Sequence, residues 1–144
     1  MPNRPIREII GRNRLVAASE STTVAEAARL MKEARVGAIL VLRKDRLVGI
    51  FTERDALNRV LAVGLDPLHT RLSQVMTAKP DSMGPDKPFG HALIAMYERG
   101  YRHMPVVENG KPVGVVSMRD ARPPELYDLE TDLKDREHIA EILG

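Results

Sequence analysis

The feature that most constrains the fold of this chain is a repeat within it. The segment Gly49-Ile-Phe-Thr-Glu-Arg-Asp55 recurs 65 residues later as Gly114-Val-Val-Ser-Met-Arg-Asp120, and Ile6–Ile10 resembles Leu72–Met76 with the register slipped by one. Self-similarity of this kind marks repeated supersecondary units. The sequence therefore predicts three parts, which are a first unit over residues 5–66, a second unit over residues 70–122 and a tail over residues 125–144.

Each unit is predicted to follow the order β-α-β-β-α, which makes the chain an α/β (α+β) protein. In the first unit Thr23-x-x-Glu26 is a capping box at a helix start, and Gly37–Leu42 and Leu47–Phe51 are apolar runs typical of buried strands. In the second unit Asn109-Gly110 lies between two apolar runs, a pattern that indicates a hairpin.

The closing helices of the two units are expected to differ. The first should run from about Glu53 to Val63, whereas Pro123-Pro124 should stop the second after little more than one turn. The tail has apolar residues at helical spacing, which predicts an amphipathic helix that packs on the body or on a partner chain; these residues are Leu126, Leu129, Leu133 and Ile139.

Composition excludes several classes of protein. There is no cysteine, which rules out disulfides, thiolate zinc sites and cysteine nucleophiles, and the 3% of aromatic residues makes a stacking platform for single-stranded nucleic acid unexpected. The longest apolar run, Val36–Leu42, is far shorter than the roughly 20 residues that span a membrane. No secretory signal follows the basic residues at the start. We therefore expect a cytoplasmic protein without membrane contact.

Charge is unevenly distributed along the chain. Residues 125–144 contain 7 acidic and 2 basic side chains, whereas residues 1–124 contain 13 acidic and 20 basic ones. A basic body with an acidic tail suits an anionic ligand. The same distribution is also expected of two solvated surfaces of unlike sign.

The repeated motif fits a nucleotide. Each copy stands between a predicted strand and a predicted helix, where Thr52 or Ser117 can cap the helix and free N–H groups favour an anion. Asp55 or Asp120, three residues further on, can accept hydrogen bonds from the two hydroxyls of a ribose. The glycine of each copy is expected to let the backbone approach the ligand closely. Alternatively, the two Thr/Ser–Asp pairs serve only as helix caps.

Two copies of G-x-x-[ST]-x-x-D in register, each after a strand and before a helix, resemble the cystathionine-β-synthase (CBS) domain family, arranged as a tandem pair over roughly residues 5–122. The strand openings at Val36–Val41 and Tyr101–Val107 are also similar to those of the family. The resemblance implies two units packed about a pseudo-twofold axis (a Bateman module), with two clefts between them. Each cleft would take its aspartate from one unit and its adenine pocket largely from the other.

The resemblance also implies which residues line each cleft. The cleft of Asp55 would include Ile50, Thr52, Thr77, Tyr101 and Arg102. The cleft of Asp120 would include Val16, Val36, Gly37, Val115 and Ser117.

Phosphate groups would need positive charge, and the basic residues differ between the units. Arg102 and His103 stand where the family often binds phosphate, whereas the first unit has Gly37 and Ala38 there. This asymmetry predicts clefts that differ in affinity or in ligand. His103 is either a phosphate contact or a satisfied core histidine. Arg54 and Arg119 are further phosphate candidates, or else solvent-facing helix residues.

No catalytic constellation is present in the sequence. The four histidines lack metal-ligand spacing, so no metal site is expected, and no serine or phosphate-loop motif occurs. We therefore expect no enzyme activity and no catalytic cofactor.

Three functions remain open at this stage. The first is a regulatory module that senses an adenosine-containing ligand (AMP, ADP, ATP, NAD(H) or S-adenosylmethionine), forms a homodimer and acts on a separate effector protein. The second is a non-catalytic dimerisation or interaction scaffold with degenerate clefts. The third, nucleic-acid binding, is prompted only by a pI of about 9.1 and by basic residues near the start that are better explained as a solvated arm: Arg4, Arg7, Arg12 and Arg14.

Overall fold

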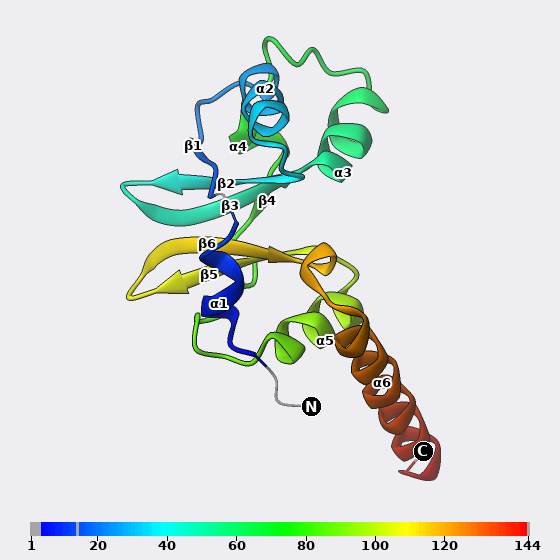
Figure 1. The fold of residues 1–144 in the computed structure, drawn as a ribbon. Helices are drawn as coiled ribbons and strands as arrows, with labels where there is room; N and C mark the ends of the chain where they lie inside the picture. The colour runs from blue at the N-terminus through cyan, green and yellow to red at the C-terminus, as the bar shows by residue number, and fades with distance from the viewer. Residues whose placement is uncertain (1–3, 14, 144) are drawn as a thin grey trace.

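The computed structural model of the protein describes residues 4–13 and 15–143. Arg14, the fourth N-terminal arginine, and Gly144, the last residue of the predicted tail, lie outside the described residues. Figure 1 shows two halves stacked sheet to sheet, with helices on the outer faces. Ala38, Leu40 and Ile50 of the first half form a buried cluster against which Val115 of the second half packs. The predicted packing of two α+β units is therefore confirmed.

The first half has the predicted order of elements. Strand β1 (Ala17–Ser19) precedes helix α2 (Val24–Ala34), and the strands β2 (Ala38–Arg43) and β3 (Arg46–Thr52) follow. β1 pairs with β2 in parallel, and β2 pairs with β3 antiparallel. The predicted cap is present, because the Glu26 N–H donates to Thr23 Oγ1 at 3.2 Å.

The second half repeats most of this order but not its first strand. Helix α5 (Phe89–Arg99) is followed by the antiparallel strands β5 (His103–Glu108) and β6 (Lys111–Ser117). In place of a first strand there is one parallel bridge between Met83 and Val106. The chain before it supplies β4 (Thr77–Ala78), which pairs with β3 of the first half and extends that sheet to four strands.

Both hairpins turn through left-handed backbone. Asn109 and Gly110 have φ values of 53° and 79°, which confirms the predicted Asn-Gly turn. Lys44 and Asp45 have φ values of 50° and 64° in the corresponding turn of the first half. The two hairpins therefore have the same local geometry although only one contains glycine.

The helix after the first motif changes its hydrogen-bonding pattern. A short α-helical turn, α3 (Glu53–Asp55), continues as a π-helical segment, η1 (Ala56–Leu61). The Ala62 N–H donates to the Leu57 carbonyl at 2.9 Å, a bond to the fifth residue back. The predicted helix is present but is not regular. The counterpart in the second half is a single 3₁₀ turn, η2 (Met118–Asp120), as short as Pro123-Pro124 predicted.

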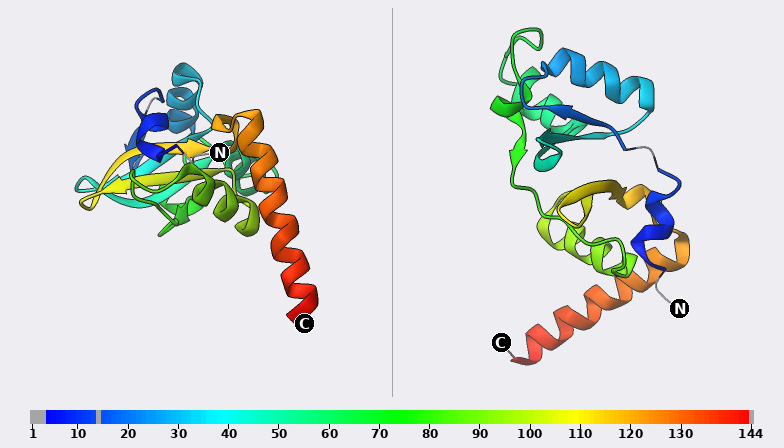
Figure 2. Two further views of the ribbon diagram at one scale, coloured as in Figure 1. Left: turned by 60° about the horizontal axis from the view of Figure 1, so that its bottom comes forward. Right: turned by 90° about the vertical axis from the view of Figure 1, so that its left-hand side faces the viewer.

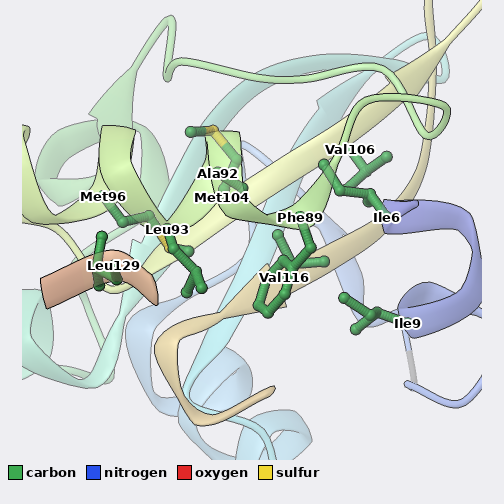
Figure 3. Close-up of a cluster of buried hydrophobic side chains, with 10 residues drawn as sticks. All are labelled: Ile6, Ile9, Phe89, Ala92, Leu93, Met96, Met104, Val106, Val116 and Leu129. Carbon is green, nitrogen blue, oxygen red and sulfur yellow. The ribbon is translucent and has the colours of Figure 1, made fainter. Parts of the chain in front are cut away.

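The two halves exchange their leading helices. Helix α1 (Ile6–Ile10), at the start of the chain, places Ile6 and Ile9 in the core of the second half, where they lie with Phe89 and Val116 (Figure 3). Helix α4 (Leu72–Val75) places both of its end residues in the core of the first half. The core of each half is therefore completed by the helix that precedes the other half in the sequence.

The tail forms the predicted helix, but only its first part packs. Helix α6 (Pro123–Leu143) begins at the proline pair, where a missing N–H is tolerated in a first turn. Leu129 is 6% exposed and Leu133 packs against the second core, whereas Ile139 is 54% exposed. Both views in Figure 2 show the far end of α6 projecting away from the body.

Two of the N-terminal arginines form ion pairs rather than a free arm. Arg4 bonds to Glu125 at 2.9 Å, and its guanidinium also donates to the Asp120 carbonyl at 2.7 Å. Arg7 pairs with Asp86 and Glu108. The interpretation of these two residues as a solvated arm is therefore wrong. None of the described helices is both long and apolar enough to cross a membrane.

Candidate ligand-binding sites

The first motif forms a reciprocal helix cap. The Thr52 N–H donates to Asp55 Oδ2 at 3.0 Å, and the Asp55 N–H donates to Thr52 Oγ1 at 3.2 Å. The second carboxylate oxygen of Asp55 lies 3.5 Å from the Arg59 guanidinium. The capping role considered for this pair is real. It leaves Oδ1 with free acceptor capacity, since an ionised carboxylate offers about four lone-pair sites.

The second motif uses its carboxylate differently. The Ser117 N–H donates to Asp120 Oδ2 at 2.8 Å, which repeats the backbone half of the cap. The Asn13 side-chain amide donates to both Asp120 oxygens, at 3.2 Å each. The carboxylate of the second motif therefore already has a partner from the segment that follows α1.

The motif glycines make room for the exchanged segments rather than for a ligand. A Cβ on Gly114 would lie 2.7 Å from both Cβ and Cγ2 of Ile10, at the end of α1. A Cβ on Gly49 would collide with the Met76 side chain, just after α4. Neither glycine lines a described cavity. The expected close approach of backbone to ligand at these positions is therefore wrong.

A cavity of about 510 Å³ opens beside the first motif, between the two halves. All six residues predicted for the cleft of Asp55 line it, together with Arg54 and His103. The second half contributes one wall of this cavity, and the linker around Thr77 contributes another. Sequence reasoning missed the remaining lining residues, which are Glu53, Leu57, Lys79, Pro80, Asp81, Gly100 and Pro105.

Tyr101 is held in place at the edge of this first cavity. Its hydroxyl donates to Asp81 Oδ2 at 3.0 Å, and Arg99 donates to the same oxygen at 2.6 Å. These two bonds hold the pKa of Asp81 below its ordinary value, while burial raises the pKa of Tyr101. The aromatic ring is therefore fixed before any ligand arrives, which lowers the entropy that binding must overcome.

A second cavity, of about 430 Å³, lies beside Asp120. Of the residues predicted for this cleft, Val16 alone does not line it. The Val16 side chain packs against the first hydrophobic core, and its carbonyl accepts from the Leu40 N–H at 3.0 Å. Arg119 lines the cavity as expected. The residues that sequence reasoning missed are Arg12, Asn13, Ala34, Arg35 and Ala38.

His103 contributes to the walls of both cavities. Its Nε2 would lie 3.1 Å from a Cβ on Gly37, so the absence of a side chain at residue 37 lets the imidazole approach. Burial lowers the pKa of His103, and the carboxylates of Glu53 and Asp120 only partly oppose that effect. The imidazole is therefore neutral at pH 7 and can both accept and donate a hydrogen bond.

Comparison with known proteins identifies the family. The model of the CBS domain matches residues 6–62 and 72–122. The chain therefore belongs to the CBS domain family and carries the domain twice in tandem. The CBS domain-containing protein CBSCBSPB2 of Arabidopsis thaliana is 41% identical over 101 residues, which make up 69% of this chain. The chain spans only 19% of the length of that relative.

Solved structures share the fold. A CBS domain protein from Pyrobaculum aerophilum, solved in complex with AMP, is 29% identical and superposes with a TM-score of 0.79 over 89% of this chain and 99% of its own. An uncharacterised conserved protein from Pyrococcus horikoshii is 33% identical, with a TM-score of 0.75 over 83% of this chain and 91% of its own. The tandem arrangement predicted from the repeat is therefore confirmed.

Proposed function

We propose that the first cavity binds an adenosine-containing nucleotide and that the protein is a regulatory module which senses it. The observation that carries this proposal is one cavity that combines the Thr52–Asp55 motif, apolar walls and the Arg102 guanidinium. Its volume of about 510 Å³ falls in the range of small-molecule sites. No group of three His, Asp or Glu side chains suited to a metal is found among the described residues.

Each part of a nucleotide has a matching part of the cavity. The base would lie against Ile50, Tyr101 and Pro105, which offer apolar surface without a tryptophan. The ribose hydroxyls would donate to the Asp55 carboxylate, whose Oδ1 has acceptor capacity left. The phosphates would lie toward Arg102, with Arg54 as a second cation.

The AMP complex of the Pyrobaculum protein supports an adenosine ligand. Proteins made up of CBS domains are generally regulatory rather than catalytic, which supports a sensing role. A nucleotide that contacts both halves stabilises the conformation in which the cavity is closed. It shifts the population from the open to the closed conformation only as far as it binds the closed one more tightly. We expect the protein to form a homodimer. We also expect a separate effector protein to respond to this change of conformation.

The test is calorimetric titration of the protein with AMP, ATP, NADH and S-adenosylmethionine. Asp55→Asn keeps an oxygen for the cap but removes the charge, so we expect nucleotide affinity to fall about ten- to hundredfold. Asp45→Asn is the matched control, because Asp45 lies in the exposed β2–β3 turn outside both cavities. This control should bind as the wild type does.

Two results would contradict the proposal. If none of the four compounds binds below millimolar concentration, the first cavity is not a nucleotide site. If one binds and Asp55→Asn leaves its affinity unchanged, the ribose is not held as described. The first outcome would favour the alternative of an interaction scaffold with degenerate clefts.

A further inference from the structure

The two cavities differ in charge. The first is lined by three cationic side chains (Arg54, Lys79 and Arg102) and by three acidic ones (Glu53, Asp55 and Asp81), so its formal charge is balanced. Among the described residues, the second is lined by three arginines and a single acid, which are Arg12, Arg35, Arg119 and Asp120. The second cavity therefore has an excess of positive charge, carried by three solvent-exposed arginines, and this charge favours an anion.

The second cavity also offers little surface for a flat base. Within the part of the chain that the structure describes, its apolar lining consists of small side chains, those of Ala34, Val36, Ala38 and Val115. The first cavity, in contrast, is lined by Leu57 and the fixed ring of Tyr101. The two sites are thus built for ligands of different chemistry.

Arg35 occupies a backbone position that disfavours arginine. It ends helix α2 with a φ of 57° and a ψ of 43°, in the left-handed region. The equivalent position of the second half, 65 residues later, is Gly100, with a φ of 77°. Glycine adopts this conformation without strain, whereas a residue with a side chain does not. Arg35 supplies a cation to the lining of the second cavity, whereas its counterpart Gly100 supplies none to the first.

The carboxylate of the second motif is already engaged. The Asn13 amide bonds both oxygens of Asp120, and it also lies 3.4 Å from the Val115 carbonyl oxygen, to which it donates. These carboxylate oxygens are the ones to which a ribose would have to donate. Asp55 differs in that no side-chain amide of the described residues bonds to it, although the Arg59 guanidinium lies 3.5 Å from its Oδ1. The second motif is therefore poorly prepared for a sugar.

The three arginines of the second cavity are available to a ligand. Within residues 4–13 and 15–143, no ion pair joins Arg12, Arg35 or Arg119 to a carboxylate. Guanidinium groups recognise phosphate oxygens through paired, charge-assisted hydrogen bonds. Three such groups around one cavity match an anion with more than one phosphate.

We propose that the second cavity is a site for an anion bearing two or more phosphate groups, held by Arg12, Arg35 and Arg119, and that it requires no nucleoside. Asp120 keeps its negative charge, but the three arginines outnumber it, so the lining has a net positive charge. The site is separate from the nucleotide site proposed for the first cavity, although His103 lines both cavities. The protein can therefore respond to two chemically different ligands.

The experiment is a calorimetric titration of the full chain with sodium pyrophosphate at low and at high salt. The wild type should bind, and its affinity should fall as salt rises. Arg35→Gly should bind at least tenfold more weakly while remaining folded, because glycine suits the left-handed backbone. Lys44→Gly is the matched control, since it also removes a cation from a residue at positive φ (50°) but lies outside the cavity. This control should bind as the wild type does.

The proposal is overturned if pyrophosphate does not bind, if Arg35→Gly binds it as tightly as the wild type, or if Lys44→Gly weakens binding equally. It is also overturned if adenosine, which has no phosphate, displaces pyrophosphate. AMP titration separates this proposal from the one for the first cavity. Asp55→Asn should weaken the binding of AMP and leave that of pyrophosphate unchanged. Arg35→Gly should weaken the binding of pyrophosphate and leave that of AMP unchanged.

Discussion

At the scale of single residues, His103 is the side chain through which pH is expected to change the stability of the protein. Its imidazole lies between the two cavities, with Arg102 and Glu53 on the side of the first and Arg119 and Asp120 on the side of the second. Burial disfavours the protonated form and lowers the pKa of the folded state. The unfolded chain, in contrast, takes up a proton at this position below about pH 6.5.

The sign of the resulting pH dependence follows from proton counting. Below about pH 6.5 the unfolded state binds a proton at His103 that the folded state resists, so stability falls as pH decreases. His103→Gln removes this contribution. Urea unfolding at pH 7 and at about pH 5 should therefore show a larger loss of stability in the wild type than in the variant. Equal losses would mean that His103 is not held neutral in the folded protein.

Other residues show how far local sequence reasoning reaches at this scale. Asp55 and Asp120 were found because the motif repeats, and both lie at a cavity. Asn13 and Arg35 were missed, since neither belongs to the repeated motif and each reaches the second cavity only through folding. The sequence did contain one signal for Arg35. When the two halves are aligned at the offset of 65 residues, this arginine corresponds to Gly100.

At the scale of elements, helix α6 divides into a packed part and a projecting part. Leu129 belongs to the second hydrophobic core, and Arg4 fixes the start of the helix through Glu125. Further along the helix Ile139 and Ile142 are exposed, with Ile142 at 69%. The apolar spacing of the tail predicted a helix correctly, but it could not tell which turns would touch the body.

This division makes a direct prediction about two apolar residues of one helix. Leu129→Ala should lower the free energy of unfolding by about 2–4 kcal/mol, because it leaves a cavity in a closed core. Ile139→Ala should change it by less than about 0.5 kcal/mol, because the side chain is already exposed to solvent. Urea denaturation of both variants measures the difference. Similar losses for the two would show that the far end of α6 is packed in solution.

At the scale of the whole molecule, the exchange of leading helices ties the halves together. Ile6 and Ile9 complete the core of the second half, while Leu72 and Val75 complete that of the first. The motif glycines Gly49 and Gly114 allow these segments to approach the strands. The repeat in sequence is therefore not the unit of packing, since each core combines residues from both copies.

Two fragments of similar length test this exchange. Residues 15–81 contain the first core with its exchanged helix α4, whereas residues 1–68 lack α4 and carry α1 without its binding surface. Far-UV circular dichroism during urea denaturation should show cooperative unfolding for residues 15–81 and none for residues 1–68. Cooperative unfolding of residues 1–68 at an equal or higher midpoint would contradict the described packing.

The sequence by itself determined the elements and the paired motifs of this protein. Capping boxes, the Asn109-Gly110 turn and apolar spacing act over a few neighbouring residues, so they can be read without knowing the fold. Only the tertiary structure decided which helix completes which core and which charges share a cavity. The reason is physical, because Arg12, Arg35 and Arg119 are brought together by packing between halves, and no local pattern encodes that contact.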